Sequence, residues 1–222
     1  MDQDEAVRGM APDSRPLIPP HGGYRALRCF ALSEVVYDGT VAFARRFLDR
    51  KSRTHDQMVQ AARSGSRNIA EGSRASGTSK KTELKLIGVA RASLDELLLD
   101  YESYLRQNNL MLWSKDEPKA VFIRNLSKRG KPESRTKQHD HSDGSDRAET
   151  QSVRVPRSES YSIYQPYIEE KSAETAANTL ICLIHQTNFL LDRLLRSLEK
   201  SFVEQGGFTE RLYRERTKGR KP

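Results

Sequence analysis

The chain has 222 residues, 36% hydrophobic and 31% charged, which is enough for one modest core with tails. Its formal net charge is +8 and its pI is about 9.5, a balance that favours an acidic partner such as nucleic acid. No apolar run approaches the roughly 18 residues of a membrane span, and no basic and apolar leader opens the chain. We therefore expect a cytoplasmic protein without a membrane partner.

The beginning of the chain divides into a lead and a first helix. Residues 1–23 end in prolines and glycines and are predicted to be a disordered lead, so the folded part is placed at residues 24–205. Apolar residues at spacings of three and four predict a first helix from Leu27 to Arg50.

A second helix is expected to follow Thr54, which is a candidate N-cap. Its middle, residues 61–66, is rich in small side chains, which favours a close approach by a neighbouring helix. Gly72 is its predicted end, because glycine adopts the left-handed cap without steric cost.

A third helix is predicted from Ser79 to Gln107, with a broad apolar face that suits contact with two neighbours. That face contains Leu84, Ile87, Ala90, Leu94, Leu97, Leu98, Tyr101, Tyr104 and Leu105.

The segment between the third and fourth long helices is mixed. A short helix is predicted from Lys119 to Leu126, with Pro118 in its first turn. Residues 128–158 are polar, highly charged and without periodicity, so we expect a disordered insert. Three tyrosines at helical spacing predict another short helix: Tyr161, Tyr164 and Tyr167.

The fourth long helix has the most regular pattern in the chain. Its apolar seam alternates spacings of four and three, as in a left-handed bundle, and consists of Ala173, Ala177, Leu180, Ile184, Thr187, Leu191, Leu194 and Leu198. Residues 206–222 follow as a basic tail. Four long amphipathic helices predict an all-α fold, an up-down four-helix bundle with a partly disordered insert between the third and fourth helices.

The stretch from residue 68 to residue 81 is close to a phosphate-binding loop, because Gly72 and Gly77 stand five apart before two lysines. A Walker A loop requires a lysine directly after the second glycine, and a strand before the loop. This chain has Thr78 at that position and a predicted helix before it. We therefore interpret the stretch as a turn between helices, with Thr78 or Ser79 capping the second one.

Catalytic and metal-binding patterns are weak. Five residues of the insert have the side chains of a metal site: His139, Asp140, His141, Asp143 and Asp146. Because the insert is predicted to be disordered, we expect no metal and no cofactor. Cys29, Cys182 and His185 stand apart, so we expect two buried thiols and a core or interface histidine. No acidic cluster in the predicted helices suits a nuclease, and we expect no enzymatic activity.

Basic residues gather in the second helix and the turn after it. From Arg50 to Lys81 there are eight basic and two acidic residues, a net charge of +6. Such a face neutralises phosphates, and the alternative is an ordinary solvated helix face. No aromatic residue interleaves these positions, so base stacking is not indicated there. The residues expected to contact nucleic acid, with a flexible clamp from the basic tail, are Arg63, Arg67, Arg74, Lys80, Lys81, Arg211, Arg214 and Arg216.

Two stretches resemble a known family. N-I-A-E-G at residues 68–72, followed by A-R-A-S-L-D-E-L at residues 90–97, resembles the four-helix bundle proteins first found encoded in 23S ribosomal RNA intervening sequences. The stretch from Leu180 to Arg216 resembles the suffix-domain subgroup of that family. Together the resemblance covers residues 24–127 and 159–216.

The resemblance implies a four-helix bundle that assembles as a ring, often a homopentamer, and it implies no catalytic residues. It also implies kinship with the accessory bundle protein of diversity-generating retroelements, whose basic pentamer engages a reverse transcriptase and nucleic acid. Our leading hypothesis is a homo-oligomeric bundle that binds RNA or a ribonucleoprotein partner, including one like a reverse transcriptase. The alternative is a protein interaction scaffold, which exposure of Phe189, Leu190 and Leu195 would favour.

Overall fold

The computed structural model describes residues 18, 21–129 and 159–218, and within these ranges every regular element is a helix. The long helices are α2 (Arg28–Phe47), α3 (Arg53–Ala75), α4 (Lys80–Gln107) and α7 (Ala173–Gln205). The shorter elements are η2 (Tyr24–Ala26), α5 (Pro118–Arg129), α6 (Glu159–Gln165), η3 (Pro166–Glu170) and α8 (Phe208–Lys218). The all-α prediction is confirmed for these residues, and none of their helices is long and apolar enough to cross a membrane.

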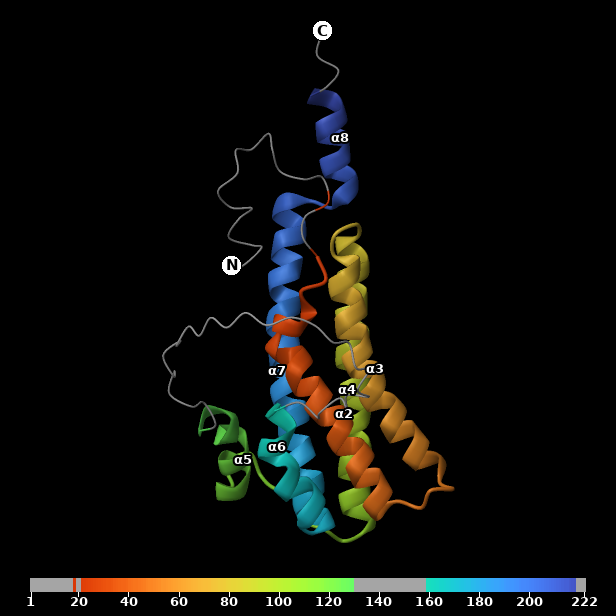
Figure 1. Ribbon diagram of the computed structural model, residues 1–222, viewed down its shortest axis with the longest axis vertical. Helices are drawn as coiled ribbons and strands as arrows, with labels where there is room; N and C mark the ends of the chain where they lie inside the picture. Colours follow the sequence, from red (N-terminus) through yellow and green to blue (C-terminus); the bar gives the residue numbers. More distant parts are fainter. Residues whose placement is uncertain (1–17, 19–20, 130–158, 219–222) are drawn as a thin grey trace, which may run out of the picture.

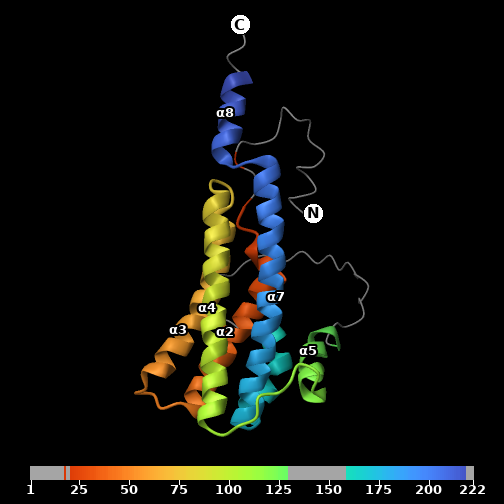
Figure 2. The ribbon, with the colours of Figure 1, turned by 180° about the vertical axis from the view of Figure 1, so that it is seen from behind.

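The long helices pack side by side in a helical bundle (Figures 1 and 2). Helix α3 packs against α4, α2 packs against α3 and α7, and α4 also packs against α7. Helices α5 and α6 pack on the lower part of this bundle, where α5 contacts α7 and α6 contacts α2. Most of the predicted lead lies outside the described residues, and the N–H of Gly22 donates to the carbonyl of Ser73 on α3.

Serine side chains begin three of the long helices. Ser52, Ser79 and Ser172 each accept a hydrogen bond from a backbone N–H in the first turn of the helix that follows, which satisfies a donor that has no partner inside the helix. Ser79 was one of the two predicted caps of α4 and is confirmed. The predicted cap Thr54 is wrong, because α3 already begins at Arg53 and Thr54 donates to Ser52.

The predicted end of the second helix at Gly72 is also wrong. Helix α3 continues to Ala75, and Gly72 lies buried inside it. A Cβ at Gly72 would lie 3.3 Å from the carbonyl oxygen of Glu83 and 3.3 Å from the Cβ of Leu86. Glycine is therefore needed here for the close approach of α4, and the turn itself lies at residues 76–79.

Two further glycines bring neighbouring helices close together. A Cβ at Gly65 of α3 would lie 2.8 Å from a methyl carbon of Leu94 on α4. A Cβ at Gly39 of α2 would lie 2.6 Å from a methyl carbon of Leu180 on α7. Real Cβ contacts are not this short, so leucine side chains fill the space that any other residue would need. The expectation of close packing at the small residues of the second helix is confirmed at Gly65.

Aromatic rings fill the core between α2 and α4. The ring of Phe43 lies 5.0 Å from that of Tyr101 in an edge-to-face contact. Tyr101 is fully buried, and its hydroxyl donates to Thr40 at 3.0 Å. Burial raises the pKa of Tyr101, so this phenol stays neutral and serves as a hydrogen-bond donor.

A polar cluster joins α4 to α7 on another face. The guanidinium of Arg91 contacts both Asp95 and Asp192, and the side-chain amide of Asn188 donates to Asp95 at 2.7 Å. These groups come from both helices, so the cluster favours one axial alignment of α4 against α7.

The segment after α4 follows the prediction in part. The short helix expected at residues 119–126 is present as α5, and it extends to Arg129, so residues 128–129 are helical and the insert prediction is wrong for them. Residues 130–158 lie outside the described part of the chain. Tyr161 and Tyr164 are buried in α6, which confirms the helical spacing of the tyrosines.

The predicted flexible tail is wrong for residues 208–218, which form helix α8 beyond the end of α7 (Figures 1 and 2). Gly206 ends α7 with a φ of +69°, a value that glycine adopts without strain. The N–H of Gly207 then donates to the carboxylate of Glu210 at 2.8 Å, which caps the next helix.

Gly65→Ala should destabilise the chain, because the new Cβ collides with the fully buried Leu94. Overpacking of this kind costs about 1–3 kcal/mol of unfolding free energy, more than the helix propensity gained by alanine. Gly88→Ala is the matched control on α4, since its Cβ would meet nothing within 4 Å. It should stabilise by about 0.5–1 kcal/mol. Urea unfolding measures both, and equal effects of the two changes would contradict this packing.

Candidate nucleic-acid interface

Three predicted contact residues, Arg63, Arg67 and Arg74, share one exposed face of α3. An α-helix turns about 100° per residue, so their spacings of four and seven keep them within one narrow stripe. The same arithmetic places them roughly opposite Gly65, which faces α4. We call these three residues the α3 stripe. The packing of α3 against α4 therefore directs the stripe away from α4.

The stripe is partly neutralised, because the exposed Glu71 lies one helical turn after Arg67 on the same side of α3. Arg67 approaches Glu34 of α2 at 4.0 Å, and its side chain remains 53% exposed. An exposed pair at this distance contributes little, so the guanidinium remains accessible to a phosphate. Arg63 forms no ion pair with any described residue.

Arg74 belongs to a small aromatic cluster with Tyr24 and Arg25. Its guanidinium donates to the Tyr24 hydroxyl at 2.9 Å and lies 5.0 Å from the ring centroid. Arg25 lies 5.8 Å from the same centroid. Hydrogen bonds from Arg25 and then Arg74 lower the pKa of Tyr24, so two guanidinium groups lie beside this phenol at the end of the stripe.

The two lysines at the start of α4 have different surroundings. The ammonium of Lys80 contacts the carboxylate of Glu83 at 3.0 Å, and both side chains are largely buried. Lys81 is exposed and has no ion pair with a described residue. Of the two predicted contacts, Lys81 is therefore the one that a phosphate can reach without breaking a pair.

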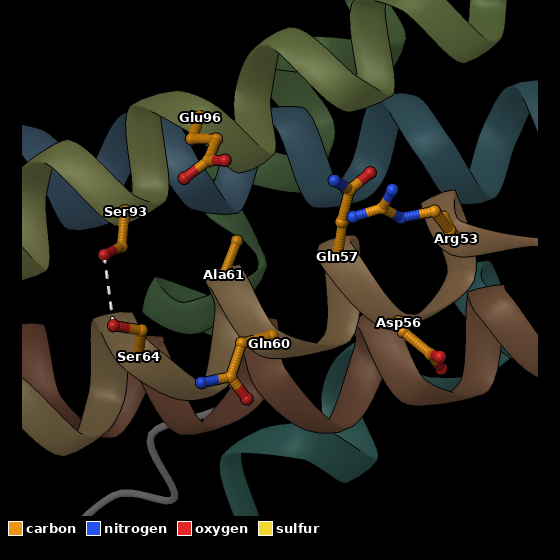
Figure 3. Close-up of a pocket in the computed structure, with 8 residues that line it drawn as sticks. All are labelled: Arg53, Asp56, Gln57, Gln60, Ala61, Ser64, Ser93 and Glu96. Carbon is orange, nitrogen blue, oxygen red and sulfur yellow. Dashed lines mark hydrogen bonds between the residues drawn. The ribbon is translucent and has the colours of Figure 1, made fainter.

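The lower part of α3 is less suited to an anion. Figure 3 shows a groove between α3 and α4 with a volume of about 410 Å³, in which Ser93 donates to Ser64 at 3.2 Å. Its lining includes Arg53, Asp56 and Glu96, so two carboxylates accompany one guanidinium. The net positive charge predicted for residues 50–81 thus lies mainly from Arg63 onward, where five basic residues accompany one acidic residue.

The basic residues of the predicted tail lie on α8. Arg214 donates to the carbonyl of Gln205 at 2.8 Å, while Arg216 is exposed. Arg211 is partly buried, and its Nε has no hydrogen-bond partner in the described structure. The predicted clamp is therefore a helix that carries arginines beyond the end of α7, and its first turn lies near the turn between α3 and α4 in both views (Figures 1 and 2).

A second basic surface was missed by the sequence analysis. A groove of about 360 Å³ lies between α2, α5 and α7, and we call it the arginine groove. It is lined by Arg28, Leu32, Arg124, His185, Gln186, Phe189, Leu190 and Arg193. Three separate segments supply the arginines, so no local run of basic residues in the sequence predicts this groove.

The apolar surplus predicted on the fourth helix is partly exposed in this groove. The side chain of Phe189 is 62% exposed, whereas Leu190 and Leu195 are partly buried against the core. His185, which we expected in the core or an interface, is exposed at the groove. The sequence analysis named Phe189, Leu190 and His185 of this groove and gave no signal for its arginines.

The two thiols are buried, as expected. Burial raises the pKa of Cys29 and of Cys182, which disfavours the reactive thiolate at neutral pH. Among the described residues no three histidine, cysteine or acidic side chains are grouped so as to hold a metal ion. The histidine and aspartate cluster at residues 139–146 lies outside the described chain.

The segment that resembles a phosphate-binding loop connects two helices. Residues 76–79 lie between α3 and α4, and Gly77 is buried against His21, whose ring would lie 2.8 Å from a Cβ there. The interpretation of this stretch as a helix–helix turn is confirmed, because a Walker A loop follows a strand.

The chain matches no protein-family model, no curated protein and no solved structure. Membership of the family that its motifs resemble therefore remains a proposal.

Glu83→Gln should change the pH dependence of stability. Burial raises the pKa of the Glu83 carboxyl despite the opposing effect of Lys80. The stability that this carboxyl contributes is therefore present below the unfolded pKa and is lost as the pH rises through the folded pKa. We expect the unfolding free energy of the wild type to fall relative to that of E83Q as the pH rises above the ordinary carboxyl pKa of about 4.5.

Chemical denaturation across this pH range measures the difference. Glu96→Gln is the control, since Glu96 is an exposed carboxylate of the same helix. A difference between wild type and E83Q that stays constant with pH would contradict the effect of burial on Glu83.

Proposed function

We propose that this chain is a non-enzymatic, homo-oligomeric bundle that binds RNA or a ribonucleoprotein partner through basic faces. The observation that carries the proposal is the α3 stripe, three arginines on one exposed helix face. Lys81 is available close by, and Arg25 and Arg74 flank Tyr24 at the end of the stripe.

The stripe suits phosphates because of its length and chemistry. From Arg63 to Arg74 an α-helix rises about 16 Å, which matches several phosphates along a nucleic-acid backbone. Guanidinium groups bind phosphate oxygens through paired hydrogen bonds, and such contacts position a strand without reading its sequence. Lys80 is a weaker candidate than the other predicted contacts because Glu83 already pairs with it.

We further propose that α2, α3, α4 and α7 form an up-down four-helix bundle of the family that the N-I-A-E-G and A-R-A-S-L-D-E-L motifs resemble. The contacts of α3 with α4, and of α2 and α4 with α7, support such an arrangement. The resemblance adds the expectation of a ring, with five copies as the favoured number.

The upper part of α7 supports an assembly of several copies. Helix α7 has 33 residues and α2 has 20, so α7 is longer by about 20 Å. Beyond Leu191 its apolar seam is covered less well, since Leu194 and Leu198 are only partly buried. Val203, on another side of the same end of α7, is 79% exposed. A neighbouring copy would cover this surface and gain the free energy of apolar burial.

Light scattering coupled to size-exclusion chromatography tests the assembly. We expect a defined homo-oligomer, with a pentamer favoured, and dissociation or a smaller species when Leu198 and Val203 are both replaced by serine. The control is Leu99→Ser, which changes an exposed leucine on α4. A monomeric wild-type chain at micromolar concentration would contradict the oligomer proposal.

Replacing Arg63 and Arg67 together by glutamine should weaken RNA binding by about 10-fold or more near 0.1 M salt, because two phosphate contacts are lost. The slope of log K against log salt concentration should fall by about 1.4 for a single strand. Fluorescence anisotropy with a labelled RNA pool measures both quantities.

Arg53→Gln is the matched control, since Arg53 is an exposed arginine of the same helix in the groove with Asp56 and Glu96. It should bind RNA nearly as well as the wild type. A wild-type complex whose affinity ignores salt, or equal losses in R53Q and the double variant, would contradict the proposed role of the stripe.

A further inference from the structure

We propose that the arginine groove binds one nucleotide unit of single-stranded RNA, with its base stacked on Phe189 and its phosphates against Arg28, Arg124 and Arg193. This inference rests on the proposed function and deepens it, because it adds a base contact that the α3 stripe lacks.

The charged residues that line the groove are all basic. Its lining holds three arginines and one histidine and contains no carboxylate. None of the three arginines forms an ion pair with a described carboxylate. The guanidinium of Arg124 contacts the carbonyl of Lys115 and the sulfur of Cys182, so Arg28 and Arg193 are the less engaged of the three. Arginine side chains without a carboxylate partner around one hollow attract an anion, and phosphate is the anion whose geometry a guanidinium matches.

The end of α2 adds to this field. Arg28 is the first residue of α2, and its N-cap Leu27 provides no side-chain hydrogen bond to the helix. The N–H groups of Cys29 and Phe30 in this first turn face the buried sulfur of Cys29. The positive end of the helix dipole therefore adds to the charge of Arg28 at this end of the groove.

Phe189 supplies the feature that a purely phosphate-binding surface lacks. Its ring is 62% exposed, on a helix face that also carries the groove residues His185 and Arg193. Stacking on an aromatic ring is how single-strand binders hold a base, because every base has a π-face. An exposed aromatic ring with arginines around it is therefore matched to a base and its flanking phosphates.

Gln186 gives an independent polar signal. Its side-chain nitrogen donates to the carbonyl of Arg124 at 2.9 Å, while its Oε1 is buried and has no hydrogen-bond partner in the described structure. A buried acceptor without a partner costs free energy, and a donor from a bound ligand would recover it. The amino and imino groups of nucleobases are such donors.

The groove is held in shape before a ligand arrives. Ala120 and Ile123 of α5 are buried, which docks this helix on the bundle. The guanidinium of Arg124 donates to the carbonyl of Lys115, and its own carbonyl accepts from Gln186. Because Arg124 is already positioned, binding costs less side-chain entropy than it would for a free arginine.

The size of the groove favours a nucleotide over a protein helix. About 360 Å³ lies near the lower end of the range for small-ligand pockets, where a single base with its sugar and phosphate fits. An acidic helix would need a longer apolar trough with several anchor positions. Phe189 is the one large apolar residue of the lining that is mostly exposed, so the groove offers a single anchor.

Phe189→Leu is the decisive variant, because it keeps an apolar side chain at an exposed position and removes the aromatic ring. We expect it to weaken binding of a labelled oligoadenylate by about 5-fold or more. Binding of an abasic strand of equal length should be unchanged, since that strand has the same phosphates and no bases. Phe189→Tyr should restore oligoadenylate binding, because tyrosine also stacks.

Arg193→Gln tests the phosphate contact, and Arg196→Gln is its control on an exposed position of α7 outside the groove lining. R193Q should weaken both the oligoadenylate and the abasic strand by about 3-fold or more, whereas R196Q should change neither. Loss of both strands in F189L, or identical behaviour of R193Q and R196Q, would overturn the inference.

Competition experiments show which kind of ligand the groove binds. Free adenosine monophosphate that displaces the strand from wild type, and not from F189L, would support the groove as a nucleotide site. Polyglutamate that binds the groove as tightly as the oligoadenylate does would overturn the inference in favour of an acidic protein.

The variants separate this inference from the proposed function. If the α3 stripe variant loses RNA while F189L binds normally, the proposed function holds and this inference fails. If F189L loses monophosphate binding in a chain that binds no RNA, the groove is confirmed and the proposed function fails.

Discussion

The close approach of α3 and α4 at Gly65 is the constraint on which the position of the α3 stripe depends. The methyl groups of Leu94 occupy the space beside Gly65, and Gly72 lies on the same side of α3 two turns later. With that side fixed against α4, the rotation of α3 about its axis is fixed as well. Arg63, Arg67 and Arg74 then lie on the opposite side, in contact with solvent. A helix packed through larger residues would stand farther from α4 and would be less restricted in rotation, so the charge pattern follows from the packing.

The two basic surfaces arise in different ways, and this explains how differently the sequence revealed them. The α3 stripe lies on one helix, so its spacing could be recognised from residue order alone. The arginine groove exists because α5 docks on α7 next to the start of α2, and its arginines are about 70 to 100 residues apart in the chain. Each of them reads as an ordinary surface residue in the sequence. Only the contacts among the three helices bring their charges together with Phe189.

The helices themselves were largely predictable, because apolar spacing reports the buried face directly. The N-cap Ser79, the helix after Pro118 and the long final helix all follow from local chemistry. The wrong predictions have a common cause, which is tertiary packing that the local sequence does not encode. Gly72 has the residue type of a helix end, yet it serves a contact with Glu83 and Leu86 that no local pattern encodes. Lys80 has the charge of a phosphate contact, yet its partner Glu83 lies one turn away in a largely buried pair. The residues of α8 read as a polar tail because their helix makes little contact with the bundle.

We propose that phosphates bind the α3 stripe and that a base stacks in the arginine groove, while the groove between α3 and α4 (Figure 3) stays free of nucleic acid. Photocrosslinking of a thiouridine-containing strand, followed by mass spectrometry of the crosslinked peptides, tests this proposal most directly. We expect crosslinks between Arg63 and Arg74 of α3 and around Phe189 of α7, and none at Gln57, Gln60 or Glu96. Crosslinks concentrated at Gln57 and Glu96, with the α3 stripe and Phe189 unmodified, would contradict it.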